Sequence, residues 1–209
     1  MAKAEAESAA AFLPEIRTLE ALRDAARSCR GCDLYRDATQ TVFGEGAERA
    51  RVILVGEQPG DMEDRQGHPF VGPAGRILDK ALAEAQIPRD EVYVTNAVKH
   101  FKYIWRGKRR LHQKPTVRQV SACRPWLQSE LQALQPKVLV CLGATAALAI
   151  VGKSVPITQL RGQFLQSIES LPALITIHPS SILRQPESDD REREYRRFLA
   201  DIKLVRQML

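Results

Sequence analysis

Short apolar runs rich in β-branched residues alternate along this chain with segments of helical periodicity. The runs are continuously apolar, which is typical of parallel strands that helices cover on both faces. They span residues 52–55, 92–94, 138–142 and 174–177. Apolar side chains three or four positions apart predict helices around residues 19–26, 77–85, 120–134 and 198–205. This alternation predicts an α/β fold: a three-layer α/β/α sandwich with a central four-stranded parallel sheet.

The chain shows no internal repeat and no linker, so we expect a single domain over residues 13–209. Residues 1–12, rich in Ala and Glu, lack a folding pattern and are predicted to be disordered. Hydrophobic residues make up 44% of the 209 residues, enough for a core, and no stretch is long enough to span a membrane. We expect a soluble, cytoplasmic, monomeric protein.

Positive charge is concentrated in one stretch of the chain. The net charge is +6, and residues 99–124 hold nine Lys or Arg residues and no acid. Phe101, Tyr103 and Trp105 lie among these cations. A solvated basic loop is one interpretation, but a long run of cations interleaved with aromatic residues favours contact with nucleic acid.

Polar clusters follow three of the four predicted strands. Ligands of open α/β sheets bind outside the carboxyl ends of the strands, so these clusters are expected to share one site. They are residues 56–61 (Gly-Glu-Gln-Pro-Gly-Asp), Thr95-Asn96, and residues 178–181 (His-Pro-Ser-Ser).

Three cysteines and one histidine have the composition of a metal site. Cys29 and Cys32 form a Cys-x-x-Cys pair, Cys123 lies near the third helix, and His100 supplies a fourth candidate ligand. Cys141 lies inside an apolar strand and is expected in the core. Spacing alone leaves open zinc, a [4Fe–4S] cluster, or thiols without a metal.

These motifs, in this order and spacing, resemble the iron–sulfur branch of the uracil-DNA glycosylase superfamily. The resemblance is closest to the X-type members, which become covalently linked to uracil-containing DNA, and it covers about residues 27–184. The motifs that carry it are residues 29–32 (CRGC), 56–60 (GEQPG), 70–76 (FVGPAGR), 95–99 (TNAVK), 108–112 (KRRLH), 123–126 (CRPW) and 178–181 (HPSS).

The resemblance implies a fold similar to uracil-DNA glycosylases and a [4Fe–4S] cluster held by Cys29, Cys32, His100 and Cys123. Ordinary iron–sulfur members carry a cysteine where this chain has His100. The implied cluster holds helices and loops together near the DNA rather than taking part in catalysis. The implied partner is uracil-containing DNA, with single strands accepted.

The resemblance also implies how a flipped uracil is bound. Phe70 stacks on the ring, Asn96 binds its amide edge, and His178 donates to O2 as negative charge develops. The residues alone favour a core aromatic for Phe70 and a turn-capping amide for Asn96, and the surrounding motifs reverse this preference. Gly56 and Asp61 are the other predicted substrate-binding residues. The predicted DNA-binding residues are Lys108, Arg109, Arg110, Ser180, Ser181 and Arg184.

His112, at the end of the basic motif, is the candidate nucleophile. We hypothesise that it captures C1′ of the sugar before water does, with Glu57 orienting its imidazole and Gln58 organising the pocket. An N-alkylimidazole is a poor leaving group, so the adduct is expected to persist. Two alternatives stay open: a hydrolytic [4Fe–4S] uracil-DNA glycosylase with turnover, and a non-catalytic iron–sulfur or zinc DNA-binding module.

Overall fold

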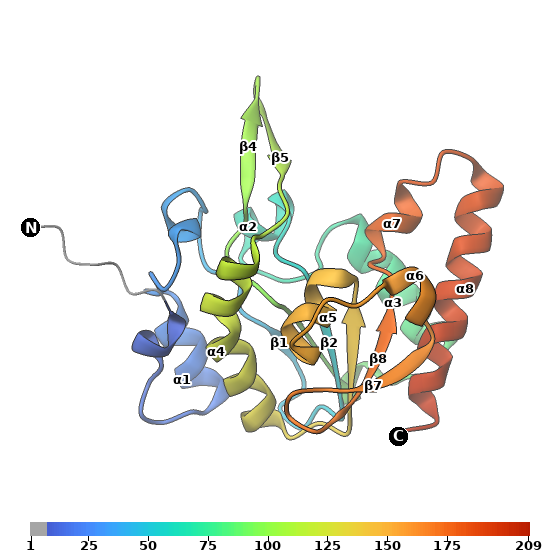
Figure 1. Ribbon diagram of the computed structural model, residues 1–209, viewed down its shortest axis with the longest axis horizontal. Helices are drawn as coiled ribbons and strands as arrows, with labels where there is room; N and C mark the ends of the chain where they lie inside the picture. Colours follow the sequence, from blue (N-terminus) through green and yellow to red (C-terminus); the bar gives the residue numbers. More distant parts are fainter. Residues whose placement is uncertain (1–7) are drawn as a thin grey trace, which may run out of the picture.

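A six-stranded sheet forms the centre of the protein, with strand order β1-β3-β2-β6-β8-β7 (Figure 1). The structure is a computed structural model and describes residues 8–209. The strands are β1 (Glu45–Gly46), β2 (Val52–Gly56), β3 (Val92–Asn96), β6 (Val138–Leu142), β7 (Gln163–Gln166) and β8 (Pro172–Thr176).

The four central strands, β3, β2, β6 and β8, are parallel, so the predicted parallel core is confirmed. The sheet as a whole is mixed, because β1 pairs antiparallel with β3 and β7 pairs antiparallel with β8. The hydrophobic pattern did not predict these edge strands. β1 is only two residues long, and β7 is mostly exposed, so neither has the continuous apolar run of a buried strand.

Helices cover both faces of the sheet (Figure 1). Side chains alternate along each strand: Ile53 and Val55 enter one apolar cluster, while Val52 and Leu54 enter the other. The first cluster packs against α1 (Leu19–Ala26), α4 (Val117–Leu134) and α5 (Ala144–Val151), and the second against α3 (Pro73–Glu84), α7 (Ser180–Leu183) and α8 (Ser188–Arg206).

No helix among residues 8–209 is long and apolar enough to cross a membrane.

The disorder predicted for residues 1–12 is wrong for its last five residues, and residues 1–7 lie outside the described part of the chain. Ala9–Phe12 forms a 3-10 helix, η1, which Ser8 caps and which contacts α4. Ala9 is buried against Gly31, where an added Cβ would lie 2.5 Å from the Ala9 nitrogen. This segment is ordered by tertiary packing, which its Ala-rich sequence does not reveal.

Part of the predicted basic loop is a β-hairpin outside the main sheet. Its strands are β4 (Tyr103–Arg106) and β5 (Arg109–His112), and it projects from the domain above the short helix α2 (Asp61–Gln66) (Figure 1). Gly107 has a φ of 59° at the first turn position, a conformation that glycine adopts without strain. The hairpin brings His112 back to the domain at its base.

Candidate functional site

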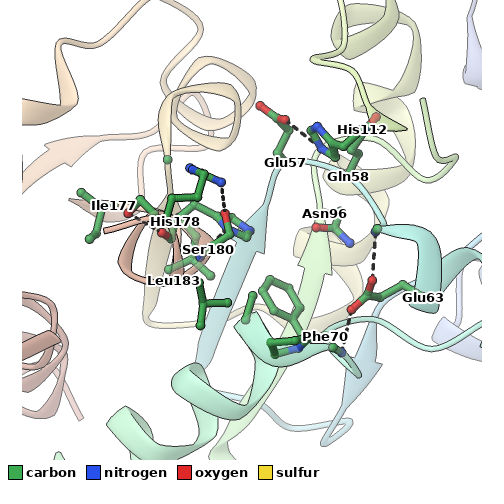
Figure 2. Close-up of a pocket in the computed structure, with 18 of the residues that line it drawn as sticks. Glu57, Gln58, Glu63, Phe70, Asn96, His112, Ile177, His178, Ser180 and Leu183 are labelled. Atoms are coloured by element: carbon green, nitrogen blue, oxygen red, sulfur yellow. Dashed lines mark hydrogen bonds and ion pairs between the residues drawn. The ribbon is translucent and has the colours of Figure 1, made fainter. Parts of the chain in front are cut away.

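A cavity of about 930 Å³ opens at the carboxyl ends of the parallel strands. Its lining comes from the segments after β2, β3, β6 and β8, and from the end of the hairpin (Figure 2). The predicted site residues that line it are Glu57, Gln58, Asp61, Phe70, Asn96, His112, His178, Ser180, Ser181 and Arg184. Lys108, Arg109, Arg110 and the four predicted metal ligands lie outside the lining, and Gly56 lies directly behind it.

Phe70 and Asn96 lie on the same side of the cavity (Figure 2), and both side chains approach Gly56. A Cβ at Gly56 would lie 2.3 Å from Asn96 Oδ1 and 2.8 Å from Phe70 Cζ, so only glycine allows this approach. Phe70 has a φ of 58°, a strained conformation for an aromatic residue. Gly75 packs directly on its carbonyl and holds it there. The ring is therefore fixed beside the Asn96 amide.

For the uracil excision that the sequence resemblance implies, replacing Gly56 with Ala is expected to displace Asn96 and Phe70 and to lower the rate by about 10²-fold, since small misplacements at a reacting centre have effects of this size. The rate constant of uracil release under single-turnover conditions is the measurement. The matched control is Ala83→Ser, which adds one heavy atom at an exposed position of α3 outside the cavity. Equal rates for Gly56→Ala and the unaltered protein would contradict this placement.

Glu63, which the sequence analysis did not identify, joins two segments of the cavity wall (Figure 2). Its two carboxylate oxygens accept hydrogen bonds from the backbone N–H groups of Gly60 at 3.0 Å and Gly72 at 2.9 Å. Glu63 thereby ties the GEQPG segment to the start of α3. A glutamate three residues after Gly60 is the sequence signal of such a cap.

His178 is held as a neutral ring whose Nε2 carries the proton. The backbone N–H of Ser180 donates to Nδ1 at 3.2 Å, and Ser180 Oγ lies 2.8 Å from the same nitrogen (Figure 2). Because Nδ1 accepts, the proton of the neutral ring resides on Nε2. Burial, with smaller effects of Arg184 and His112, lowers the pKa of His178 to about 4. His178 is thus a neutral hydrogen-bond donor at pH 7.

His112 reaches the cavity from the end of β5 and faces Glu57 (Figure 2). His112 Nε2 lies 3.3 Å from Glu57 Oε1, and the Thr145 hydroxyl donates to the other carboxylate oxygen. Desolvation lowers the pKa of His112, Glu57 opposes this change, and Arg184 adds to it. The cation that lowers the pKa of this ring is therefore Arg184, on the opposite rim of the cavity.

Gln58 anchors the base of the hairpin. Its Nε2 donates to the carbonyls of Lys102 at 3.1 Å and Gln113 at 3.0 Å, and its Oε1 accepts from the Lys102 N–H at 3.1 Å. These two residues lie just outside β4 and β5, so a single buried side chain joins both ends of the hairpin. Gln58 fixes the position from which His112 enters the cavity.

The three predicted phosphate-binding cations of the hairpin have different environments. Lys108 and Arg109 are exposed at its tip. The Arg110 side chain is only 5% exposed and forms ion pairs with Asp61 and, at 2.6 Å, with Asp64. Arg110 therefore fastens the hairpin to α2 instead of facing solvent. Asp61 lines the cavity, but its carboxylate is occupied by Arg110 and Arg65.

Ser180, Ser181 and Arg184 form the opposite rim of the cavity on α7 and directly after it. Arg184 is exposed and donates to Ser180 Oγ at 2.9 Å, while Ser181 Oγ donates to the His178 carbonyl at 2.8 Å. The rim thus combines a cation, two hydroxyls and the exposed side chain of Leu183.

Lys99 belongs to the basic stretch in sequence but is fully buried. Its ammonium donates to Glu130 at 2.5 Å, to the Thr95 hydroxyl at 2.6 Å and to the Asn96 carbonyl at 2.9 Å. Glu130 also accepts from Tyr93. This ion pair fixes the end of β3, and with it the backbone of Asn96. Sequence patterning could not find it, because the partner lies 31 residues away on α4.

The three cysteines predicted as metal ligands lie near one another, with Cys29 and Cys123 buried and Cys32 half-buried. Cys123 lies close enough to Cys29 and Cys32 for their charges to affect its pKa, which burial raises to about 12. The Cys29 sulfur accepts from Trp126 Nε1 at 3.2 Å, and the Cys123 sulfur from the Lys99 N–H at 3.3 Å. Such donors are typical around cluster-bound sulfurs.

The predicted fourth ligand, His100, is turned toward another partner. Its Nε2 lies 2.9 Å from the Thr41 hydroxyl. Within residues 8–209, no three His, Cys, Asp or Glu side chains are arranged so as to hold a metal ion. The thiol environment suits a cluster, whereas the histidine would have to change its hydrogen bond to join one.

Comparison with known proteins identifies the family. Residues 43–203 match the model of the uracil DNA glycosylase superfamily. A type-4 uracil-DNA glycosylase of Thermotoga maritima is 35% identical over 184 residues, covering 88% of this chain and 90% of that protein. A type-4 uracil-DNA glycosylase of Archaeoglobus fulgidus is 34% identical over 179 residues, covering 81% of this chain and 86% of that protein. This chain belongs to the uracil-DNA glycosylase superfamily.

Proposed function

We propose that this protein excises uracil from DNA and that His112 then bonds covalently to C1′ of the emptied sugar. The observation that carries the proposal is the position of His112, whose imidazole enters the cavity 3.3 Å from Glu57 Oε1. The same cavity contains His178 and Asn96. A nucleophile, its orienting carboxylate and the residues that would bind uracil thus share one space.

Uracil recognition begins with a nucleotide flipped out of the stack. The Phe70 ring stacks on the base, and the Asn96 side-chain amide pairs with the edge that distinguishes uracil from cytosine. Gly56 supports this pair because it has no Cβ to separate them. The rigid placement of all three residues favours one flat base over bulkier alternatives.

Bond cleavage depends on His178. As the C1′–N1 bond breaks, its electron pair moves onto uracil, and the Nε2–H of His178 donates to uracil O2 where negative charge develops. The Ser180 N–H fixes the required tautomer, and the lowered pKa keeps the ring neutral. The neutral His178 ring can therefore stabilise the leaving uracil anion by donating its Nε2–H, without first being protonated to an imidazolium.

Capture follows on the sugar. The lone pair of the His112 imidazole forms the N–C1′ bond, and Glu57 stabilises the positive charge that develops on the ring. The remaining N–H proton of the ring is then transferred through solvent to the uracil anion, which leaves as neutral uracil. The product is a neutral N-alkylimidazole. One protein molecule therefore processes one uracil.

DNA binding uses both rims of the cavity. Lys108 and Arg109 at the hairpin tip, and Arg184 with Ser180 and Ser181 on the other side, contact the phosphate backbone on either side of the flipped nucleotide. Arg110 and Asp61 serve instead to position the hairpin, because they pair with each other.

The direct test is incubation with a single-stranded oligonucleotide containing one uracil, followed by a denaturing gel. We expect a band of combined protein and DNA mass that survives heat and SDS, and no such band with thymine in place of uracil. Free abasic DNA in molar excess over protein would contradict capture. It would instead support a glycosylase that hydrolyses the bond and turns over.

A [4Fe–4S] cluster held by Cys29, Cys32, His100 and Cys123 belongs to the same proposal. The close thiols and the N–H donors to two of the sulfurs support it. When bound, the cluster supplies a cross-link between the segment after α1, the segment after β3 and helix α4. His100 would exchange its bond to Thr41 for the cluster.

Protein purified without oxygen is expected to contain about four iron atoms and to absorb near ~400 nm. Removal of iron with a chelator is expected to lower the melting temperature, because the cross-link between three segments is lost. The control is Cys141→Ser, a buried thiol in the apolar interior of β6, which should retain iron. Zinc in place of iron, or no metal, would contradict the assignment.

The pH dependence of capture follows from the His112 environment. Only the neutral imidazole attacks, and burial lowers its pKa from the usual 6.5. The rate of adduct formation on saturating DNA is therefore expected to be level above pH 6.5 and to fall only at lower pH. Arg184→Gln removes a cation that lowers this pKa, so the acid limb should move to higher pH. An acid limb that does not move would contradict the role given to Arg184.

A further inference from the structure

Three aromatic rings form a continuous series from the interior to the outer part of the hairpin. The centroids of Phe101 and Tyr103 lie 5.1 Å apart in a stacked arrangement, and those of Tyr103 and Trp105 lie 5.6 Å apart, edge to face. Exposure rises along the series, from 1% for Phe101 to 62% for Trp105. Apart from its edge-to-face contact with Tyr103, most of the Trp105 side chain is open to solvent on a small projecting hairpin.

The hairpin that carries Trp105 is held in place from several sides. The Tyr103 hydroxyl donates to the Asp37 carbonyl at 2.9 Å, and Arg110 lies over the rings of Phe101 and Tyr103 at 5.4 and 5.0 Å while pairing with α2. Gln58 ties both ends of the hairpin together. Trp105 is thus displayed on a rigid support, so little side-chain ordering is needed when a ligand binds.

The surroundings of Trp105 carry the charge that suits a nucleic-acid strand. Lys108 is exposed at the turn of the hairpin, and Arg106 and Arg109 are exposed on the face opposite Trp105. Residues 99–124 contain no acid to oppose them. A small hairpin that combines an exposed aromatic ring with cations able to contact a phosphate backbone has the composition of a single-strand binding surface.

The hairpin also leads directly into the candidate active site. Tyr103 pairs with His112 across the strands, and Trp105 pairs with Arg110, so all four side chains lie on one face of the hairpin. A DNA strand with one nucleotide in the cavity would pass close to this face.

We propose that Trp105 stacks on an unpaired nucleobase of the strand that carries the flipped deoxyuridine, forming a second nucleotide-binding subsite on the hairpin. The proposal rests on the proposed function, because it takes DNA as the ligand. It implies preference for single strands, since a base already stacked and paired in a duplex is not free to stack on Trp105. Stacking on an aromatic side chain is sequence-tolerant, so any base can fill the subsite.

The test uses a single-stranded oligonucleotide that contains thymine and no uracil, so that binding is measured without chemistry. The chain has two tryptophans, and Trp126 is fully buried. DNA-dependent quenching of fluorescence, and protection from an added quencher, therefore report on Trp105. Both signals are expected with the unaltered protein and absent from Trp105→Phe.

Affinity provides the second readout. Trp105→Ala is expected to weaken single-strand binding about tenfold to hundredfold, and Trp105→Phe to retain most of the affinity. The matched control is Ile104→Ala, which removes an apolar side chain of similar exposure from the adjacent position, on the other face of the hairpin, and should change binding by less than twofold. Trp105→Ala should change the affinity for a fully paired duplex only slightly.

Equal losses for Trp105→Ala and Ile104→Ala, or no loss for either, would overturn the stacking subsite. The subsite would also be overturned if substituting Trp105 changed the mass that sedimentation gives for the DNA-free protein. Such a change would mean that the ring contacts a second copy of the chain. A separate uracil-release assay distinguishes the two proposals. Quenching without any uracil release would refute the proposed function and leave the subsite intact. Uracil release without quenching would support the proposed function and refute the subsite.

Discussion

Replacement of His112 by Gly is expected to abolish the heat-stable and SDS-stable adduct with uracil-containing DNA, while uracil release continues. The imidazole is the only nucleophile that the account gives to C1′, and the bond to uracil is broken with the help of His178, which the substitution leaves in place. Removing the ring also opens space beside Glu57 for water. The variant is therefore expected to form free abasic DNA and to turn over.

The measurement is the ratio of adduct to released uracil, determined on the same samples. The unaltered protein should give one adduct for each uracil released, and His112→Gly should give none. His68→Ala is the matched control, because this histidine is exposed and pairs with Glu45 at 2.6 Å outside the cavity. An adduct that persists in His112→Gly would move the nucleophile to another residue.

Replacement of His178 by Ala is expected to lower the rate of uracil release by about 10²–10³-fold, the usual effect of losing one donor to a developing oxyanion. Binding of uracil-containing DNA should change far less, because the donor acts mainly on charge that develops during bond cleavage. Adduct formation should slow by the same factor, since capture follows cleavage.

Single-turnover release of uracil at saturating protein separates this effect from binding. His178→Asn keeps an N–H donor and is expected to recover part of the lost rate, whereas Ser181→Ala removes a nearby hydroxyl and should leave the cleavage step within severalfold. A rate for His178→Ala close to that of the unaltered protein would show that uracil O2 is stabilised elsewhere.

Sequence patterning predicted the parts of the fold that local physics determines. Continuous apolar runs identified the four parallel strands, because strands buried on both faces leave no polar alternation. The positions of Glu57, Asn96 and His178 at the strand ends then predicted a shared cavity, since parallel strands end at one edge of the sheet. The structure brings these three residues to the same cavity.

The features that sequence patterning did not predict depend on contacts between segments far apart in the chain. The Arg110 ion pairs with Asp61 and Asp64 span more than forty residues, so a predicted phosphate ligand proves to be an anchor of the hairpin. The Lys99–Glu130 pair likewise joins β3 to α4 and removes one cation from the basic surface. Neither pairing has a local pattern, and a charged side chain in sequence does not reveal whether it is solvated or buried.

The most direct test of covalent capture is the intact mass of the protein after incubation with a single-stranded oligonucleotide that contains one uracil. We expect a species with the mass of the protein plus the oligonucleotide minus one uracil, containing one protein and one oligonucleotide. An unmodified protein mass, together with abasic DNA in excess of protein, would contradict it.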